Sequence, residues 1–531
     1  MMEEKQMKNG KKLLSILLAV VMVISALPLV MAKSDVGIGG QCGPNLFWEL
    51  SDAGKLTIKG TGEMKFDDWD DETEEETGYT KWNRYNDEIL TVEIQSGATN
   101  IANYAFEDCN YLTSITIPET VTVIGYRAFE HCSALTNIAI PSSVKEIGNY
   151  AFYYCSGLSS ITLPASITVI NDGTFYDCYN LKTVNIQGQL TVIGAYAFDY
   201  CTSLENFIIP STVTSIGENA FYNCEKLTSF QIPAAVESIG ERAFYNYNLQ
   251  GITVDPNNAN YTSENGVLFN KNKTTLIQYP VHIDSTAYTV PATVTRIENY
   301  AFENAEILKS ISFNAALKEI GNYAFRNSDA LASVSIPNGV ESIGYSAFED
   351  CSSIETVVIP ASATDISYSA FHYCHSLDSF SVAAENPDYS SDSYGVFFNK
   401  EQTHLIQYPS GNERTSYAVP ATVEVIESNA FHNADSLTSV TLPSGLTAIN
   451  YNAFHGCDSL LSIDIPASVK EIDSYAFSYC YNLGAVTLHN GLETIDYEAF
   501  VSCSSLPTGI PTPWRPGMNW RNPLSRMWRT T

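Results

Sequence analysis

Residues 112–134 read LTSITIPETVTVIGYRAFEHCSA, and near-copies of this stretch follow one another along most of the 531-residue chain. A phenylalanine marks the same place in each copy and returns every 23 residues within three runs. A period this strict indicates a repeat architecture, because one unit is too small to bury its own apolar face and must stack on copies of itself. The sequence therefore predicts a β-rich repeat solenoid. The marking residues are Phe106, Phe129, Phe152, Phe175, Phe198, Phe221 and Phe244, then Phe302, Phe325, Phe348 and Phe371, then Phe431, Phe454, Phe477 and Phe500.

Each unit is predicted to begin with a short strand. Ile115 and Ile117 alternate with Ser114 and Thr116, which is the period of a strand with one buried face, and Pro118 ends it. A second apolar pair and a glycine follow, and the phenylalanine begins a short helical or irregular stretch that returns the chain to the next unit. Coils stacked at roughly 4.7 to 4.9 Å predict a parallel sheet on one face, on the order of 70 Å long.

The outward positions of this predicted sheet are small and mostly uncharged, and we expect them to face a ligand. Many weak contacts from successive coils would then sum over a large area. The candidate ligand-facing residues are Ser114, Thr116, Ser160, Thr162, Thr183, Asn185, Ser310, Ser312, Ser333, Ser335, Ser439 and Thr441.

The recurring pattern L-x-S-I-x-I-P-x-x-V-x-x-I-G-x-x-A-F-x-x-C resembles the BspA-like subclass of leucine-rich repeats, which is found in secreted and cell-surface proteins of bacteria and some protozoan parasites. The resemblance covers about residues 89 to 507. It implies a curved, right-handed leucine-rich-repeat array and a role in surface adhesion or protein binding. It names no ligand.

The two ends of the chain frame the repeats. Residues 1–32 place lysines before an apolar run that ends in small residues, which predicts a secretory signal peptide. Residues 33–88 predict an N-terminal β-hairpin cap, with two alternating runs around an Asp-Ala-Gly turn and a loop that holds eight acidic residues. We expect the solenoid to occupy residues 89–507 and residues 508–531 to form a basic tail outside the repeat. No segment after the signal peptide is expected to insert into a membrane.

The C-terminal tail departs sharply from the rest of the chain in composition. It contains four arginines, no acidic residue and three of the six tryptophans. Two interpretations are open: a short basic tail that attaches to something acidic, or a frame-shifted or truncated end after which the array would continue. We favour the second, because we expect the tail not to cap the last coil and the last strand would leave an unpaired sheet edge.

Two units break the 23-residue period, near residues 249–301 and 377–430. The phenylalanines on either side lie 58 and 60 residues apart. Each long unit holds two apolar runs around an Asn-Lys turn, which predicts a hairpin added to the coil. Insertions in solenoids often form the binding face. Alternatively, the hairpin only extends the coil and packs on it.

The cysteines follow the repeat as well. Eleven of the twelve lie three residues after a repeat phenylalanine, so each coil contributes one at the same phase. Parallel side chains place their Cβ atoms alongside each other, which disfavours disulfides between neighbours. We predict a ladder of buried free thiols. The eleven are Cys109, Cys132, Cys155, Cys178, Cys201, Cys224, Cys351, Cys374, Cys457, Cys480 and Cys503.

The sequence contains little that indicates catalysis or metal binding. His131, His372, His432 and His455 lie one or two residues after a repeat phenylalanine, where other units carry tyrosine, and this exchange favours a structural role. His432 and His455 are expected to be stacked neighbours. No nucleophile elbow, metal-binding helix, phosphate loop or dinucleotide motif is present. We expect no enzyme activity and no catalytic, cofactor-binding or metal site.

These observations predict a secreted or cell-surface binding protein whose ligand is an extracellular protein of a host or neighbouring cell. The formal net charge of −31 disfavours nucleic acid and anionic lipid as partners. The alternative is a carbohydrate-binding surface protein that uses its tyrosines as platforms for sugar rings. The tyrosines that recur two residues before the phenylalanine are Tyr150, Tyr196, Tyr300, Tyr323 and Tyr475.

Overall fold

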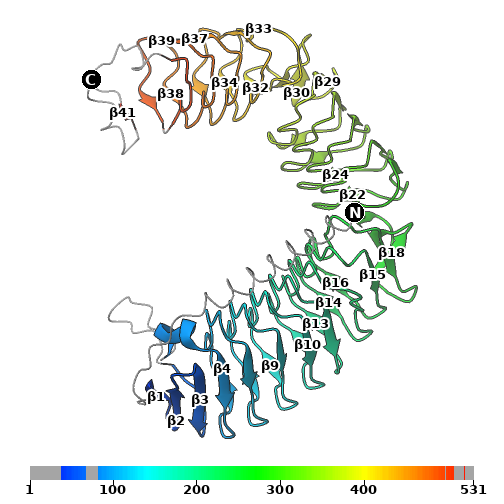
Figure 1. Cartoon of the computed structure of the whole chain (residues 1–531). Helices are drawn as coiled ribbons and strands as arrows, with labels where there is room; N and C mark the ends of the chain where they lie inside the picture. The colour runs from blue at the N-terminus through cyan, green and yellow to red at the C-terminus, as the bar shows by residue number, and fades with distance from the viewer. Residues whose placement is uncertain (1–37, 67–81, 497, 507–518, 521–531) are drawn as a thin grey trace, which may run out of the picture.

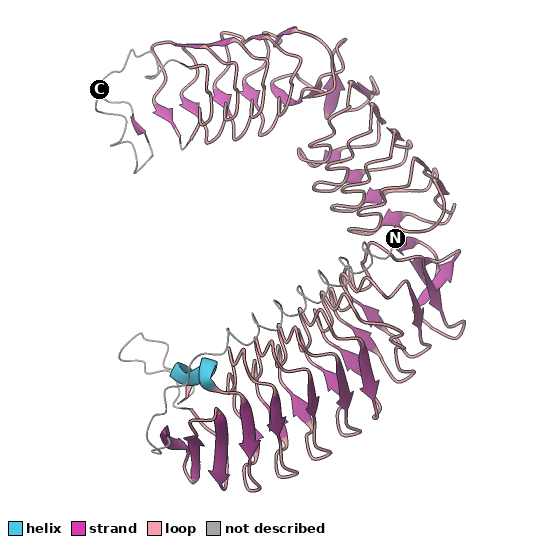
Figure 2. Ribbon diagram, viewed as in Figure 1, coloured by secondary structure: helices cyan, strands magenta, loops and turns pink. Residues whose placement is uncertain are grey.

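The structure is a computed structural model that describes residues 38–66, 82–496, 498–506 and 519–520. Successive coils stack into an open arc (Figure 1). Short strands and loops make up almost all of it, and the one helix of the described residues is the 3-10 helix η1 (Asn83–Glu88) (Figure 2). The predicted β-rich solenoid is confirmed. Within the described ranges, no helix is both long and apolar enough to cross a bilayer.

The predicted strand of each unit forms a first ladder, in which equivalent strands pair in parallel and in register. Ile138 pairs with Ile161, and both are buried, whereas Asn137, Ala139, Ser160 and Thr162 beside them are exposed. The ladder is interrupted in several places, among them after β12, where Asn206 has a φ of 52° and its coil forms no strand in this position. Its strands are β4 (Thr91–Ile94), β6 (Ser114–Thr116), β8 (Asn137–Ala139), β10 (Ser160–Leu163), β12 (Thr183–Ile186), β15 (Ser229–Ile232), β17 (Gly251–Val254), β21 (Ala287–Thr289), β23 (Ser310–Ser312), β25 (Ser333–Ser335), β27 (Thr356–Ile359), β29 (Ser379–Val382), β33 (Ser416–Ala418), β35 (Ser439–Thr441), β37 (Ser462–Ile465) and β39 (Ala485–Leu488).

A second ladder, which the sequence pattern did not reveal as strand, is built from the apolar pair before the glycine. Most coils contribute two residues that pair in parallel with the same two residues of the next coil, as Ile193 does with Ile216, although no such pairing joins Glu146–Ile147 to Val169–Ile170. The solenoid therefore has two parallel faces rather than the single one predicted. The strands are β5 (Asn100–Ile101), β7 (Val123–Ile124), β9 (Glu146–Ile147), β11 (Val169–Ile170), β13 (Val192–Ile193), β14 (Ser215–Ile216), β16 (Ser238–Ile239), β22 (Arg296–Ile297), β24 (Glu319–Ile320), β26 (Ser342–Ile343), β28 (Asp365–Ile366), β34 (Val425–Ile426), β36 (Ala448–Ile449), β38 (Glu471–Ile472) and β40 (Thr494–Ile495).

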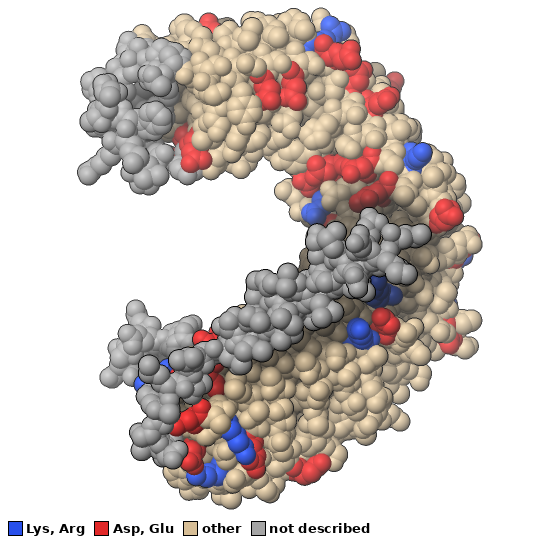
Figure 3. Space-filling model, in the orientation of Figure 1, with Lys and Arg blue, Asp and Glu red and all other residues tan. Residues whose placement is uncertain are grey.

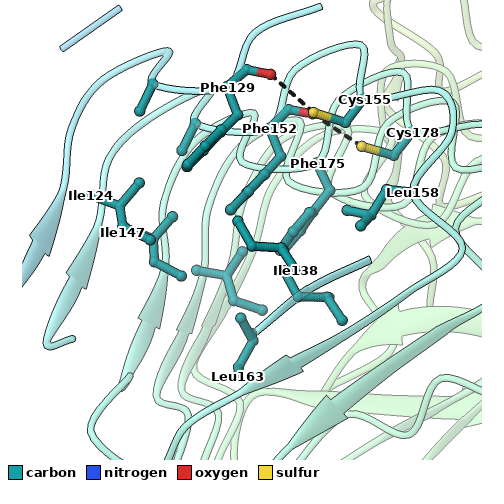
Figure 4. Packing of buried hydrophobic residues seen from close by; sticks show 14 of the residues in the cluster. Ile124, Phe129, Ile138, Ile147, Phe152, Cys155, Leu158, Leu163, Phe175 and Cys178 are labelled. Carbon is teal, nitrogen blue, oxygen red and sulfur yellow. Dashed lines mark hydrogen bonds between the residues drawn. The ribbon is translucent and has the colours of Figure 1, made fainter. Parts of the chain in front are cut away.

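The repeat phenylalanines stack inside the coils. Consecutive ring centroids lie 4.6 to 6.1 Å apart and the ring planes differ by 0 to 22°. The cysteine ladder runs beside this stack (Figure 4). The Cys155 Sγ donates a hydrogen bond to the Phe129 carbonyl at 3.0 Å, and Cys178 does the same to Phe152 at 3.1 Å. All twelve thiols are free and buried, which confirms the predicted ladder.

The segment around each phenylalanine is a run of turns and not the short helix that was one of our expectations. The residues two before and two after the phenylalanine often have positive φ, as Tyr150 (56°) and Tyr154 (57°) do. A non-glycine residue rarely adopts this conformation. Here it lets alternate amides donate to the next coil, for example Tyr150 to the Asp172 carbonyl and Tyr154 to the Tyr176 carbonyl. We call this side of the solenoid the turn edge.

The N-terminal cap contains the predicted hairpin and one further strand. The predicted runs form β2 (Leu46–Leu50) and β3 (Lys55–Gly60), which pair antiparallel, and β1 (Ile38–Gly43) pairs with β2. Because β3 pairs in parallel with β4, the cap continues directly into the first ladder. The fully buried Trp82 stacks on Phe106 at 5.8 Å and covers the end of the phenylalanine stack.

Each long unit contains a three-stranded antiparallel addition. The first joint (residues 249–301) holds β18 (Tyr261–Glu264), β19 (Val267–Asn270) and β20 (Thr275–Gln278). The second joint (residues 377–430) holds β30 (Tyr389–Ser391), β31 (Phe397–Asn399) and β32 (His404–Gln407). In both joints the third strand pairs in parallel with the next strand of the second ladder. The hairpin is thus built into the solenoid wall, as our alternative interpretation of the insertions expected.

The two joints divide the buried interior into three blocks. The first block ends at the first joint, the second extends from Val267 to Ile406, and the third begins at Val396. Each joint also carries a coil whose stacking ring is a tyrosine. Tyr279 stacks on Phe302 at 4.8 Å, and Tyr408 stacks on Phe431 at 5.2 Å. Both tyrosines lie 23 residues before the ring they contact.

Parts of the chain lie outside the described residues. These include the predicted signal peptide, all eight acidic residues of the predicted loop and most of the C-terminal tail. Within the tail, β41 (Asn519–Trp520) pairs in parallel with β40. Our expectation that the tail leaves the last coil without a covering strand is therefore wrong for the second ladder.

Candidate functional site

The first-ladder face displays the twelve predicted ligand-facing residues. All twelve are exposed, because strand side chains alternate and the isoleucines and valines between them face the interior. Parallel pairing sets them in rows: Ser160 lies beside Thr183, and Thr162 lies beside Asn185. The twelve fall on all three blocks, so the structure brings together neighbours within a block and not the whole set.

Side chains with ionisable groups gather elsewhere, on the turn edge. The residue immediately after each repeat phenylalanine forms a line that runs across the coils, and we call this line the turn column. Its members include acids, tyrosines, histidines and an arginine. In order they are Glu107, Glu130, Tyr153, Tyr176, Asp199, Tyr222, Tyr245, Glu303, Arg326, Glu349, His372, His432, His455, Ser478 and Val501.

Tyrosine rings cover much of the turn edge in the first block. Tyr153 stacks on Tyr176 at 5.0 Å, and Tyr222 stacks on Tyr245 at 4.9 Å. Of the tyrosines two residues before the phenylalanine, Tyr150 contacts Tyr126 at 6.2 Å edge to face. In the second block, Tyr300 and Tyr323, which occupy this same position, stack at 5.0 Å. Most of these rings are half-buried, so their faces are largely occupied by one another.

A buried ion-pair cluster crosses the first joint. The Glu303 carboxylate is fully buried and lies 2.8 Å from the Arg242 guanidinium and 3.1 Å from that of Arg326. The Arg242 guanidinium also lies 4.7 Å from the Tyr222 ring centroid and 4.6 Å from that of Tyr300. Burial raises the pKa of Glu303, and the two arginines oppose this shift. The chain thus holds a guanidinium between a turn-column acid and tyrosine rings.

Histidines occupy the same column beside the second joint. His432 and His455 stack at 4.7 Å, as the sequence predicted, and Tyr373 packs edge-on against His432 at 4.6 Å. Burial lowers the pKa of His372 to about 4. Burial, with neighbouring histidines adding to the effect, lowers the pKa of His432 to about 3. These rings therefore pack as neutral groups.

The part of the chain that the structure describes contains no group of three or more His, Cys, Asp or Glu side chains arranged to hold a metal ion. The thiols are also poor ligands, because burial raises their pKa values and their Sγ atoms donate to carbonyls. The predicted candidate histidines are thus explained by ring packing. Sequence reasoning missed Asp199 and Glu303, although reading down the turn column would have shown an acid interrupting a run of tyrosines.

The chain belongs to the BspA type leucine-rich-repeat family. Six copies of the family's repeat region match the chain, within residues 84–205, 191–286, 279–395 and 410–511. This confirms the resemblance drawn from the repeat pattern. No protein with a curated description matches the chain.

Several solved structures are similar to the chain. A leucine rich cell surface protein from Faecalibacterium prausnitzii is 28% identical with a TM-score of 0.48, and the match covers 66% of this chain and 96% of that protein. A leucine-rich repeat protein from Eubacterium ventriosum is 25% identical with a TM-score of 0.39, covering 86% and 99%. The pneumococcal vaccine antigen PcpA is 16% identical with a TM-score of 0.38, covering 86% and 100%.

Proposed function

We propose that the protein is a non-catalytic binding protein, secreted or displayed at a cell surface, that holds an extracellular protein ligand along the first-ladder face. The observation that carries this proposal is the twelve exposed, small, uncharged residues set in rows by in-register pairing. Such a surface offers hydroxyl and amide groups without the entropy cost of ordering long side chains. The family match supports the location, since the solved relatives include a leucine rich cell surface protein.

In the view of Figure 3, the coils of the N-terminal block show few charged side chains, although the protein's net charge is −31. Whole interfaces are about as apolar as other protein surface, and charged residues are depleted at their centres. A protein ligand could therefore contact several coils without burying an unpaired charge.

The carbohydrate alternative has weaker support. Sugar rings bind to free aromatic faces. The faces of Tyr300 and Tyr323 are stacked on each other at 5.0 Å, and Tyr150 is contacted edge-on by Tyr126 and Tyr176. A glycan array is the direct measurement for this alternative, and binding that is lost on Tyr150→Ala would favour it.

One coil offers a matched pair of variants for the test. Thr162 is exposed on the first ladder, and Thr168 is exposed beside the second ladder of the same coil. The full chain is used to capture proteins from an extracellular preparation of host or neighbouring cells. Thr162→Arg, which places a long charged side chain in the row, should abolish capture, whereas Thr168→Arg should leave it unchanged. Equal capture by both variants contradicts the proposed face.

A further inference from the structure

The turn column of the first block has one interruption. Two stacked tyrosine pairs, Tyr153 with Tyr176 and Tyr222 with Tyr245, flank a single coil whose column residue is Asp199. An aspartate side chain is much shorter than a tyrosine, so no ring continues the stack between Tyr176 and Tyr222. Two tyrosines of the same coil contact the flanking column rings: the Tyr196 ring centroid lies 6.4 Å from that of Tyr176, and the Tyr200 centroid lies 5.6 Å from that of Tyr222.

Asp199 and its neighbours present acceptors that the chain does not use. Asp199 is only 4% exposed, and its Oδ1 has no hydrogen-bond partner among the described residues. On the next coil, Asn219 and Asn223 are 8% and 9% exposed, and the Oδ1 of each likewise lacks a partner within the described ranges. Buried polar atoms are nearly always paired, because leaving one unpaired is costly. Three buried acceptor oxygens on two neighbouring coils thus lack a partner within the described ranges, and a group with several donors could satisfy them.

The chain itself shows which group suits this arrangement. Glu303 occupies the same column position and is paired with Arg242, whose guanidinium lies against the rings of Tyr222 and Tyr300. At Asp199, no Lys or Arg of the described residues lies within ion-pair distance. Arg242 acts on it only through longer-range charge, since its guanidinium is bound to Glu303. The two positions share an acid and tyrosine rings, and they differ in whether a cation is supplied.

We propose that Asp199, together with the rings of Tyr176, Tyr196, Tyr200 and Tyr222, forms a binding site for an arginine side chain of a partner protein. The guanidinium supplies five N–H donors in a planar fork, which suits a carboxylate and nearby amide oxygens. Its flat cation also stacks on tyrosine faces. Tyr200 is exposed, and in the proposed complex its ring would be displaced to give the arginine side chain access to Asp199. This inference rests on the proposed function in one respect, namely that the ligand is a protein.

The electrostatics of the site agree with a bound cation. Burial, with the Asp177 carboxylate adding to the effect, raises the pKa of Asp199 to about 8, although Arg242 and the Tyr200 backbone amide oppose the shift. The other ionisable groups that interact with this carboxyl are Tyr150, Tyr176, Tyr200 and the buried thiols of Cys201 and Cys224. A guanidinium that binds at neutral pH would shift the carboxyl to its ionised form, and the proton would pass to the buffer. Binding should therefore strengthen as the pH rises.

The test uses the full chain and three short capped peptides that differ only at the central residue: arginine, citrulline or lysine. Citrulline has nearly the shape of arginine but no charge. Titration calorimetry should give a dissociation constant of about 1 mM for the arginine peptide, as expected for one charged hydrogen-bonded pair with ring contacts. Asp199→Asn should weaken the affinity for the arginine peptide at least about tenfold, and Tyr200→Ala should weaken it severalfold. Glu205→Gln, which removes an exposed charge of the same coil, should leave the affinity unchanged. Proton release, measured in two buffers of different ionisation enthalpy, should disappear in Asp199→Asn.

Several results would overturn the proposal. Failure of the arginine peptide to bind, binding of citrulline equal to that of arginine, or an Asp199→Asn affinity within twofold of the parent would each do so. Equal binding of lysine would overturn the assignment of a guanidinium. These outcomes can be distinguished from those of the capture experiment on the first ladder. If Thr162→Arg abolishes capture but Asp199→Asn does not change the affinity for any peptide, the proposed function is supported and the arginine site is contradicted.

Discussion

The two joints have the same backbone frame. In the first, the buried Asn258 side chain donates to the Pro233 and Val236 carbonyls, and its Oδ1 accepts from two amides of the following turn. In the second, Asn386 makes the same four bonds with the corresponding groups of its own coils. Lys271 and Lys400 each donate to the carbonyl of that asparagine. The insertion is therefore one structural module used twice.

The joints differ in the turn column beside that frame. A buried carboxylate and two arginines bridge the coils at the first joint, whereas neutral histidine and tyrosine rings meet at the second. Because the asparagine hydrogen bonds fix the backbone of both joints, the side chains of the turn column can differ between them. The repeat thus specifies the shape of the solenoid, whereas the turn column determines how each boundary between blocks responds to charge and pH.

The largest effect is expected where the joints are identical. Replacing Asn258 or Asn386 by leucine removes four hydrogen bonds and leaves two buried carbonyls without their donor, which should cost about 4 kcal/mol at either joint. Urea unfolding with hydrogen exchange on the flanking coils measures this cost. The exposed neighbour Asn257→Ala should stay within ~0.5 kcal/mol. Clearly unequal costs at the two joints would show that they are not the same module.

The next effect should appear at the first joint alone. Arg242→Met leaves the buried Glu303 with only Arg326 as a partner and should destabilise the joint by about 3 kcal/mol. Adding Glu303→Gln should recover part of the loss, because the unpaired charge is then removed. The exposed pair of Lys318 and Glu341 provides the control, since Lys318→Met should cost less than about 1 kcal/mol. If Arg242→Met costs no more than Lys318→Met, the ion pair of Arg242 with Glu303 does not stabilise the joint.

Acid should affect the joints with opposite sign. His372 and His432 have pKa values of about 4 and about 3 in the folded protein, below the unfolded value of 6.5, so they contribute stability above pH 6.5 that is lost as the pH falls. Between neutral pH and pH 5.5, each of these two histidines should lower the free energy of unfolding at the second joint by about 1.4 kcal/mol. Glu303 has a raised pKa, so its contribution at the first joint increases as the pH falls.

Hydrogen exchange, corrected for the intrinsic pH dependence of the amide rates, can follow coils on both sides of each joint. Acidification should open the coils of Phe371 and Phe431 before those of Phe244 and Phe302. The double variant His372→Phe and His432→Phe should remove the acid response of the second joint. Simultaneous opening of both joints in the parent protein would contradict the assignment.

The repeat period was sufficient to predict the solenoid, the first-ladder strands and the free thiols, because each depends on one residue type recurring at a fixed phase. The second ladder was missed because two-residue strands are too short to show alternation. The extra coils at Tyr279 and Tyr408 were missed because tyrosine replaces phenylalanine in the stack. Within the candidate sites, the exposed first-ladder residues could be predicted from the alternation of the strand. The proposed arginine site could not, because the rings of Tyr176 and Tyr222 come from coils 23 residues before and after Asp199.

The smallest effect is expected in the thiol ladder, at the joints and between them alike. Ser328 occupies a cysteine position and donates its Oγ to the Phe302 carbonyl at 3.0 Å, just as Cys178 donates its Sγ to Phe152. Cys178→Ser in the middle of a block and Cys374→Ser beside the second joint should therefore each cost about 1 kcal/mol or less. Valine at either position fills the space but leaves the carbonyl unpaired, so it should cost more than serine does. Urea unfolding of the four variants checks this order. If serine lowers the free energy of unfolding more than valine does, the position requires an apolar side chain rather than a hydrogen-bond donor. If substitution lowers it more at Cys374 than at Cys178, the difference between joint and block extends beyond the turn column.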